Sequence, residues 1–173
     1  MHAMSLIAFY YSLLILSSVH PDSLPARNFS TTAIADNSKN GTVNRGRILQ
    51  LINEVRAKGC KCGTITYKAA PPLQWNELLE KAALGHVNDM YKKKYFSHTA
   101  SDGSNAGVRM ERAGYKWMTY GENIATGFIN EQEVVEGWFK SPGHCKNLMS
   151  PDFREMGVAR IGNLWTQTFG RKL

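Results

Sequence analysis

Two short segments carry side chains that could bind a metal ion. His144 follows a Pro-Gly turn in the run 141–149 (SPGHCKNLM), and Glu122 is the carboxylate of the segment 121–125 (GENIA). Imidazole is a good ligand for zinc and other divalent ions, and a nearby carboxylate can bind the ion or fix the imidazole. Because Pro142 disfavours helical geometry before it, we expect these side chains at the rigid ends of secondary-structure elements. The residue types therefore indicate a metal-binding or ligand-binding site.

Length and composition restrict the class of protein. The chain has 173 residues, of which 43% are hydrophobic, and this is enough for one good-sized core. The formal net charge of +7 would suit an acidic partner, but the basic residues are scattered along the chain. The one compact run, residues 92–94 (KKK), is typical of a solvated last helical turn. No nucleic-acid-binding motif is present, so we predict no nucleic-acid partner. We expect one globular domain that is a monomer.

The N-terminal region is expected to lie outside that domain. Residues 6–16 (LIAFYYSLLIL) are almost continuously apolar, but they are fewer than the roughly 20 residues that a membrane-spanning helix requires. They are typical of a signal-peptide core, and an uncleaved anchor is the alternative because the cleavage site is poor. We predict a signal peptide or N-terminal anchor over 1–19, a polar linker over 20–44 and a domain over 45–173. This organisation indicates a secreted, extracellular or periplasmic protein without a spanning segment.

The three cysteines suit an exported protein, because an oxidising compartment permits disulfides. Cys60 and Cys62 form a C-x-C pair, and Cys145 lies far along the chain. A bond between such close neighbours is strained, so we expect one of the two to pair with Cys145 and the other to be left as a thiol. The sequence does not decide which. A thiolate metal site that joins Cys145 to His144 is the alternative, and it requires reduced thiols.

Hydrophobic periodicity predicts helices around a small antiparallel sheet. Helical spacing indicates a first helix over 47–58, ended by Gly59, and a long helix whose apolar stripe runs from Trp75 to Met90. His86 lies within that stripe, which favours a hydrogen-bonded core histidine over a ligand. The other expected elements are helices over 105–113, over 131–140 and from residue 142 or 143, and strands over 157–161 and 164–169 around a tight Gly-Asn turn.

Several motifs together resemble one family of secreted proteins. In chain order they are 73–76 (LQWN), 95–98 (YFSH), 102–104 (DGS), 113–115 (AGY), 121–125 (GENIA), 138–144 (WFKSPGH) and 156–158 (MGV). Their order and spacing resemble the CAP superfamily, which includes cysteine-rich secretory proteins, venom antigen 5 and plant pathogenesis-related class 1 proteins, and most of all its compact bacterial SCP-like branch. The resemblance implies an α+β fold, an α-β-α sandwich whose small central antiparallel sheet is covered by helices on both sides.

The resemblance also implies a cleft that can bind zinc or another divalent cation. Many members hold two histidines and two acidic residues there. The residues carried over onto this chain are His98, Glu122 and His144 as candidate metal ligands, with Asn123 and Ser141 as support for the cleft. The fourth position departs from the pattern, because Ser141 stands where larger members have a glutamate. Glu136 lies on the same expected helix, two positions before Trp138, and its side chain need not face the same cleft.

Three functions are compatible with these residues. The favoured one is an extracellular binding module for a lipid, sterol or cell-envelope ligand, with Trp117, Tyr120 and Phe128 as candidates to line its cleft. The second is a metal-dependent hydrolase that uses the two cleft histidines to hold the ion and Glu122 as its catalytic base. No nucleophile is evident in the sequence, so enzyme status is left open. The third is a secreted scaffold that acts through contacts with a protein partner.

Overall fold

The computed structural model describes residues 42–173. The predicted signal peptide or anchor over 1–19, and the predicted linker as far as residue 41, lie outside the described residues. Within 42–173, the helices are all too short or too polar to cross a membrane.

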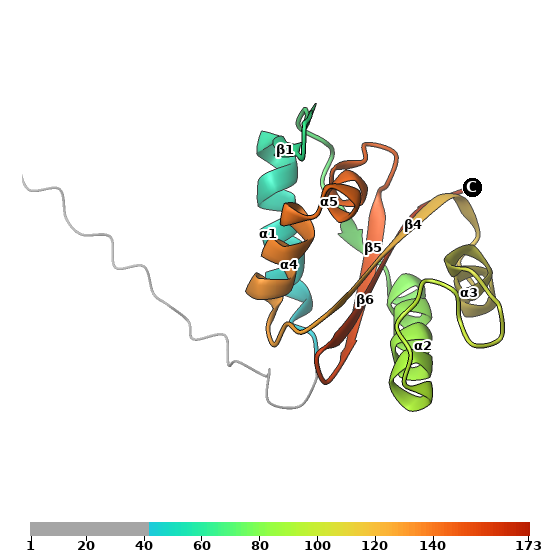
Figure 1. Ribbon diagram of the computed structural model, residues 1–173. Helices are drawn as coiled ribbons and strands as arrows, with labels where there is room; N and C mark the ends of the chain where they lie inside the picture. Colours follow the sequence, from blue (N-terminus) through green and yellow to red (C-terminus); the bar gives the residue numbers. More distant parts are fainter. Residues whose placement is uncertain (1–41) are drawn as a thin grey trace, which may run out of the picture. The chain divides into compact units, whose positions relative to one another are not determined.

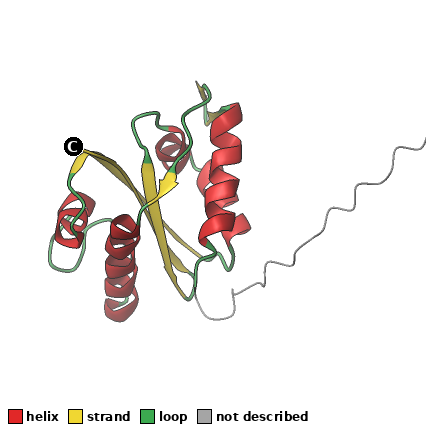
Figure 2. Ribbon diagram, turned by 180° about the vertical axis from the view of Figure 1, so that it is seen from behind, coloured by secondary structure: helices red, strands yellow, loops and turns green. Residues whose placement is uncertain are grey.

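Five helices and six strands follow one another in the described chain. They are α1 (Arg45–Lys58), β1 (Cys60–Cys62), β2 (Ile65–Tyr67), β3 (Gln74–Trp75), α2 (Glu77–Lys93), α3 (Ala106–Ala113), β4 (Trp117–Thr126), α4 (Glu131–Lys140), α5 (Pro142–Met149), β5 (Glu155–Ile161) and β6 (Leu164–Lys172). Seen from behind in Figure 2, the strands run between the helices. The predicted hairpin of β5 and β6 is confirmed, with Ile161 opposite Leu164 at its turn.

The main sheet lies between two layers of helices. Its strand order is β3-β5-β6-β4, and β6 pairs antiparallel with both β5 and β4. The short edge strand β3 pairs with β5 in parallel, through two residues. Helices α2 and α3 lie on one side of the sheet, and α1, α4 and α5 lie on the other (Figure 1). The α-β-α sandwich is therefore confirmed, with a sheet that is antiparallel except at its β3 edge.

Asparagine side chains begin the first four helices. The caps are Asn44, Asn76, Asn105 and Asn130, and each side-chain oxygen accepts a hydrogen bond from a backbone N–H in the first turn. At Asn76 the acceptor serves the N–H groups of Leu78 and Leu79. The long helix therefore begins at Glu77, and the prediction that Trp75 belongs to it is wrong. Trp75 precedes the cap and pairs with Met156 in the sheet.

Strand β4 and the β1–β2 hairpin were not predicted. Residues 122–125 of β4 are all buried, because helices cover both faces of the sheet at this point. A strand covered on both faces lacks the alternation of polar and apolar residues that identifies a half-exposed strand. The segment 121–125 therefore belongs to an edge strand of the sheet whose residues 122–125 are nevertheless buried between both helical layers.

One close approach fixes α2 to the sheet, and one set of buried hydrogen bonds holds the opposite helical layer together. A Cβ added at Gly157 of β5 would lie 2.0 Å from the backbone nitrogen of Glu80, so α2 packs its backbone directly onto the sheet. On the other side, the buried guanidinium of Arg56 in α1 donates hydrogen bonds to the carbonyls of Leu148 at 2.6 Å and Pro71 at 2.8 Å. These buried bonds hold α1 against the end of α5.

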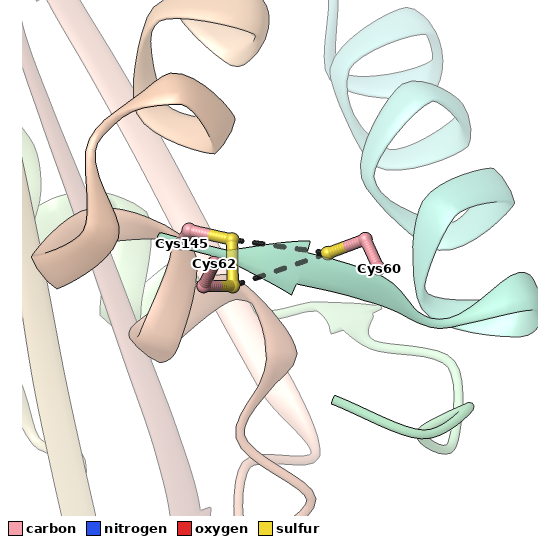
Figure 3. A group of neighbouring side chains, drawn as sticks. All are labelled: Cys60, Cys62 and Cys145. Atoms are coloured by element: carbon pink, nitrogen blue, oxygen red, sulfur yellow. Dashed lines mark hydrogen bonds between the residues drawn. A yellow bond between two sulfur atoms is a disulfide. The ribbon is translucent and has the colours of Figure 1, made fainter. Parts of the chain in front are cut away.

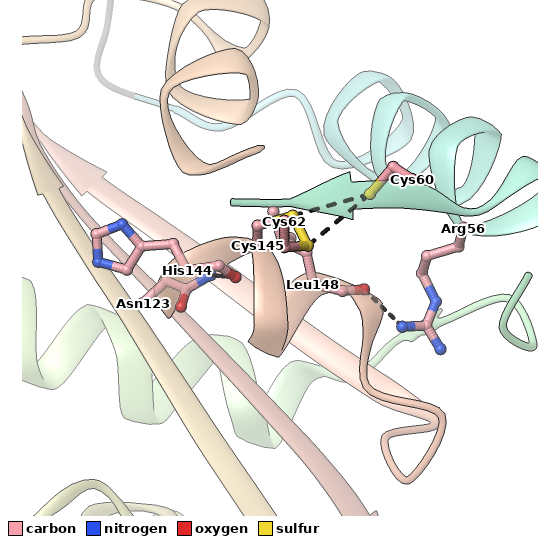
Figure 4. Close-up of a disulfide and its surroundings, with 7 residues drawn as sticks. All are labelled: Arg56, Cys60, Cys62, Asn123, His144, Cys145 and Leu148. Carbon is pink, nitrogen blue, oxygen red and sulfur yellow. Dashed lines mark hydrogen bonds between the residues drawn. A yellow bond between two sulfur atoms is a disulfide. The ribbon is translucent and has the colours of Figure 1, made fainter. Parts of the chain in front are cut away.

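The predicted long-range disulfide is confirmed, and its partner is Cys62. Cys62 is bonded to Cys145, with 5.5 Å between their Cα atoms, and Cys60 is the one cysteine of residues 42–173 outside a disulfide (Figure 3). The bond joins β1 to α5. Figure 4 shows the ring of His144 directed away from the three sulfur atoms, so the structure does not support the alternative metal site that joins Cys145 to His144.

Candidate functional site

Glu122 on β4 is surrounded by ionisable side chains from other elements. Its Oε1 atom lies 2.8 Å from Nδ1 of His98, and its Oε2 atom lies 2.5 Å from a guanidinium nitrogen of Arg109 on α3. The Nε2 atom of His86 is 3.9 Å from Oε1. The carboxylate is buried, so these partners replace the water that a charged group would otherwise require. Both oxygens of Glu122 are therefore already engaged within the protein.

The segment between α2 and α3 that carries His98 is tied to α2 by Asp89. The carboxylate of Asp89 accepts hydrogen bonds from the hydroxyl of Tyr95 at 2.5 Å and from the backbone N–H of Ser101 at 2.9 Å. These bonds, with that of Tyr95 first, hold the pKa of Asp89 well below its usual range. Asp89 thus fixes the backbone on both sides of His98, whose own side chain is 57% exposed.

His86 is the buried histidine that the apolar stripe of α2 predicted. Its Nε2 atom is 2.8 Å from the carbonyl oxygen of Ser97, and its Nδ1 atom has no hydrogen-bond partner within residues 42–173. Burial lowers the pKa of His86, although the negative charge of Glu122 opposes this effect. The neutral ring therefore supports the backbone next to His98. Its closeness to Glu122 was not expected.

His144 lies at the start of α5, and Asn123 holds that helix on β4. The Nδ2 atom of Asn123 donates to the carbonyl of His144 at 3.3 Å, and its Oδ1 atom accepts from the side chain of Asn147 at 2.9 Å. Burial lowers the pKa of His144, and the charge of His98 lowers it further. Ser141 occupies the N-cap position of α5, but its side chain makes no capping hydrogen bond.

The three candidate ligands do not form one closed cluster. In the part of the chain that the structure describes, the one group of three metal-capable side chains whose ligand atoms all lie within 4.8 Å of each other is the cysteine group. His98 and Glu122 contact each other, but His144 stands further away. The donor chemistry fits an ion held by the two imidazoles, because Nδ1 of His98 is bound to Glu122 and its Nε2 atom is left for a ligand bond. In such an arrangement Glu122 would orient His98 and would not itself bind the ion.

The three aromatic residues proposed to line a cleft do not lie together, so that prediction is wrong. Trp117 and Tyr120 make an edge contact with a 4.5 Å centroid distance, and both pack against Gly107 of α3. Phe128 packs against Gly137 of α4, in the core of the other helical layer. The three rings are partly buried and pack on opposite sides of the sheet, so they do not line one shared cleft.

A polar cavity of about 390 Å³ lies between α2, α3 and the segment before α3. Its lining includes His86 and Arg109, two residues that also lie close to Glu122. Its charged lining is largely internally paired, since Arg112 contacts Asp102 at 2.6 Å and Lys93 lies 3.3 Å from Asp89. The remaining lining residues are Lys81, Ala82, Gly85, Ala100, Ser101, Ser104 and Ala113.

A second cavity, of about 460 Å³, lies between α1, α4 and β1, and we call it the α1–α4 groove. Its lining residues are Leu51, Glu54, Val55, Cys60, Lys61, Gln132, Val135, Glu136, Phe139 and Lys140. Glu136 thus faces this groove, where it lies 3.9 Å from Lys140, and it does not join His98 and Glu122. The fourth acidic position of the family cleft is therefore not supplied by Glu136.

The sequence matches the Cysteine-rich secretory protein (CAP) family over residues 49–167. This chain belongs to the CAP family. A curated CAP-like relative is YkwD of Bacillus subtilis, which is 35% identical over 125 residues, covering 71% of this chain and 45% of the relative. This chain therefore spans less than half the length of that relative. The family assignment agrees with the motifs that suggested it.

Two solved structures are similar to this CAP domain. An extracellular protein containing a SCP domain from Bacillus anthracis is 31% identical, with a TM-score of 0.66, over 73% of this chain and 40% of that one. An outer surface protein of Borrelia burgdorferi is 20% identical, with a TM-score of 0.60, over 74% of this chain and 89% of that one. At this low identity the second likeness concerns the fold alone.

Arg109 is the site residue of this CAP domain that the sequence analysis missed. It lies on α3 and also donates to the carbonyl of Ser104 at 2.7 Å, so it joins the segment before α3 to Glu122 on β4. The only available signal was a basic residue in a short helix ahead of a buried carboxylate motif. Such residues are common on solvated faces, so the contact became visible only with the fold.

Proposed function

We propose that this protein is an extracellular binding protein that holds the acyl chain of a single-chain amphiphile, with an anionic head, in the α1–α4 groove. The observation that carries this proposal is the composition of the groove. Leu51, Val55, Val135 and Phe139 supply apolar surface, and lysines lie at its edge. A volume of about 460 Å³ falls within the usual range of small-molecule sites, about 300 to 1,000 Å³.

Of the charged groups that line the groove, Lys61 is the one available to an anionic head. Glu136 is partnered by Lys140 at 3.9 Å, and Glu54 accepts from the side chain of Gln50 at 2.8 Å. Lys61, by contrast, has no acidic partner within ion-pair distance in residues 42–173. A carboxylate or phosphate beside Lys61 would gain a charge-assisted hydrogen bond, while the chain of the amphiphile follows the groove between the two helices. A fatty acid is the simplest ligand with this chemistry.

The test is a binding titration of the full chain with hexadecanoate. We expect saturable binding that falls at least tenfold in Phe139→Asp, because a charge would then lie against the acyl chain, and that also weakens in Lys61→Glu. Leu84→Asp is the matched control, since Leu84 is 50% exposed on α2, in the other helical layer. Equal loss in both aspartate variants, or no saturable binding by the folded wild type, would direct the search to a polar cell-envelope ligand or a protein partner.

A second candidate function, divalent-ion binding, is favoured by the contact between His98 and Glu122. The carboxylate fixes one ring nitrogen of His98 and leaves the other for a ligand bond, with His144 as the second imidazole. A bound ion would supply an electrophilic centre with open positions. Because His98 and Arg109 occupy both oxygens of Glu122, this carboxylate is not a free base, and the geometry supports binding ahead of hydrolysis.

Calorimetric titration of zinc tests this second function. We expect micromolar or tighter binding by the wild-type chain and its loss in both His98→Ala and His144→Ala. Absence of binding while all three proteins are folded would assign the histidines a structural role.

A further inference from the structure

Three sulfur atoms lie together where β1 meets α5. The Sγ atom of Cys60 is 3.9 Å from that of Cys62 and 3.8 Å from that of Cys145, and these two are joined by the disulfide (Figure 3). Cys60 and Cys62 are two positions apart in β1, so their side chains lie on the same face of the strand. All three cysteines of the chain therefore form one group, with one thiol beside one disulfide.

We propose that this group is a thiol–disulfide exchange site in which Cys60 can replace Cys62 as the partner of Cys145. The Cys60 thiol loses its proton to solvent, and the thiolate attacks the Sγ atom of Cys145. A Cys60–Cys145 bond forms, the Cys62–Cys145 bond breaks, and Cys62 leaves as a thiolate that takes a proton from solvent. One disulfide and one thiol are present before and after, so the exchange requires no oxidant or reductant.

Chain geometry selects Cys145 as the sulfur that is attacked. Attack on Cys62 would instead join Cys60 to Cys62. These residues are two positions apart in one strand, so their Cα atoms lie roughly 6.6 Å apart in extended backbone. That separation is at the long end of the disulfide range of about 4.4 to 6.8 Å. Attack on Cys145 instead joins β1 to α5, two elements that the present disulfide already holds together with Cα atoms 5.5 Å apart.

Cys60 has the freedom that this attack requires. The Sγ atom of Cys60 is almost equally far from the two disulfide sulfur atoms, so it lies beside the S–S bond. A thiolate attacks a disulfide along the line of the bond that breaks. The Cys60 side chain must therefore rotate before it can attack. It lies in a three-residue strand, is only partly buried and lines the α1–α4 groove, which leaves space for rotation. Burial raises the pKa of the Cys60 thiol, so the exchange should accelerate as the pH rises above neutral.

The exchange changes which thiol is accessible. In the present pairing the free thiol is Cys60, which borders the groove, whereas Cys62 is only 3% exposed. After exchange the free thiol is buried, and a reagent in the groove no longer reaches it. Cys145 is bonded in both pairings, so α5, with His144 beside Cys145, keeps its tether to β1 (Figure 4). The site can thus conceal a reactive thiol without releasing α5.

Peptide mapping of the full chain tests the proposal. Samples held at pH 6 and at pH 9 are denatured at pH 6 with N-ethylmaleimide and digested with trypsin, which cuts after Lys61 and separates Cys60 from Cys62. At pH 6 we expect the label on Cys60. After pH 9 we expect at least a tenth of the label on Cys62, together with a linked Cys60–Cys145 peptide. A label confined to Cys60 at both pH values, or a Cys60–Cys62 peptide with label on Cys145, would overturn the proposal.

A pair of variants provides an independent measurement. Cys62→Ser should oxidise to a Cys60–Cys145 disulfide with no free thiol, and Cys60→Ser, the matched control, should keep the Cys62–Cys145 bond. Two free thiols in a folded Cys62→Ser chain would show that Cys60 does not reach Cys145, which contradicts the exchange. Should Cys62→Ser not fold, the wild-type peptide map decides the question by itself.

Discussion

The Nδ1 atom of His98 lies 2.8 Å from the Oε1 atom of Glu122, and this contact joins the segment after α2 to the edge strand β4. Arg109 contacts the other carboxylate oxygen at 2.5 Å. The carboxylate therefore orients one imidazole and is itself neutralised from α3. In the proposed metal site, Glu122 would thus orient His98 and would not bind the ion directly.

Glu122→Gln should weaken zinc binding by roughly 10- to 100-fold without abolishing it, because the amide retains the size of the side chain but loses the charge that orients His98. His98→Ala, which removes the ligand itself, should abolish binding. Calorimetric titration of both variants measures the difference. Complete loss in Glu122→Gln would make the carboxylate a direct ligand, and an unchanged affinity would remove it from the site.

The Cys62–Cys145 disulfide should contribute strongly to stability. Its cysteines are 83 positions apart, and the chain-entropy argument assigns a loop of this size about 4 to 5 kcal/mol. Cys145→Ser should therefore lower the melting temperature markedly, as should reduction of the wild-type chain. Cys60→Ser is the control and should melt close to the oxidised wild type. Thermal melts that are the same with and without reductant would contradict this prediction.

Gly157 and Gly85 form a matched pair for the packing of α2. An alanine at 157 would place its Cβ against the backbone of Glu80, so we expect Gly157→Ala to cost about 3 kcal/mol or more, the upper end of ordinary overpacking penalties. At Gly85, on α2, a Cβ meets nothing within 4 Å, and Gly85→Ala should stabilise the fold by about 0.4 to 1 kcal/mol. Urea unfolding of the two variants compares these opposite effects.

Asp89 should contribute to the pH dependence of stability. Its pKa is lowered in the folded protein, first by the hydrogen bond from Tyr95, so its stabilising effect is complete above the ordinary carboxyl pKa of about 3.9. The stabilising effect should decline as the pH falls below the ordinary carboxyl pKa, because the unfolded chain then binds a proton at Asp89 while the folded chain resists protonation. The difference in unfolding free energy between wild type and Asp89→Asn should thus shrink from pH 6 to pH 2. A constant difference over that range would contradict the assignment.

The sequence by itself determined the elements whose signals are local. Helical spacing and the turn at Gly162 predicted the helices and the β5–β6 hairpin, because an amphipathic stripe or a tight turn needs only neighbouring residues. The position of Trp75 was misjudged, since an apolar residue just before a cap continues the helical stripe in sequence. The separation of the cysteines was enough to predict a bond to Cys145, but not to choose between Cys60 and Cys62.

Tertiary structure decided the relations between residues that are distant in sequence. Residues 122–125 of β4 are covered on both faces, so no alternating pattern identified the strand. The contact of Arg109 with Glu122 joins α3 to β4, and no spacing along the chain indicated it. The position of Cys60 beside the disulfide also depends on how β1 meets α5. Local signals specify elements because they act over a few residues, whereas a site is specified by packing, which brings together groups that no spacing along the chain relates.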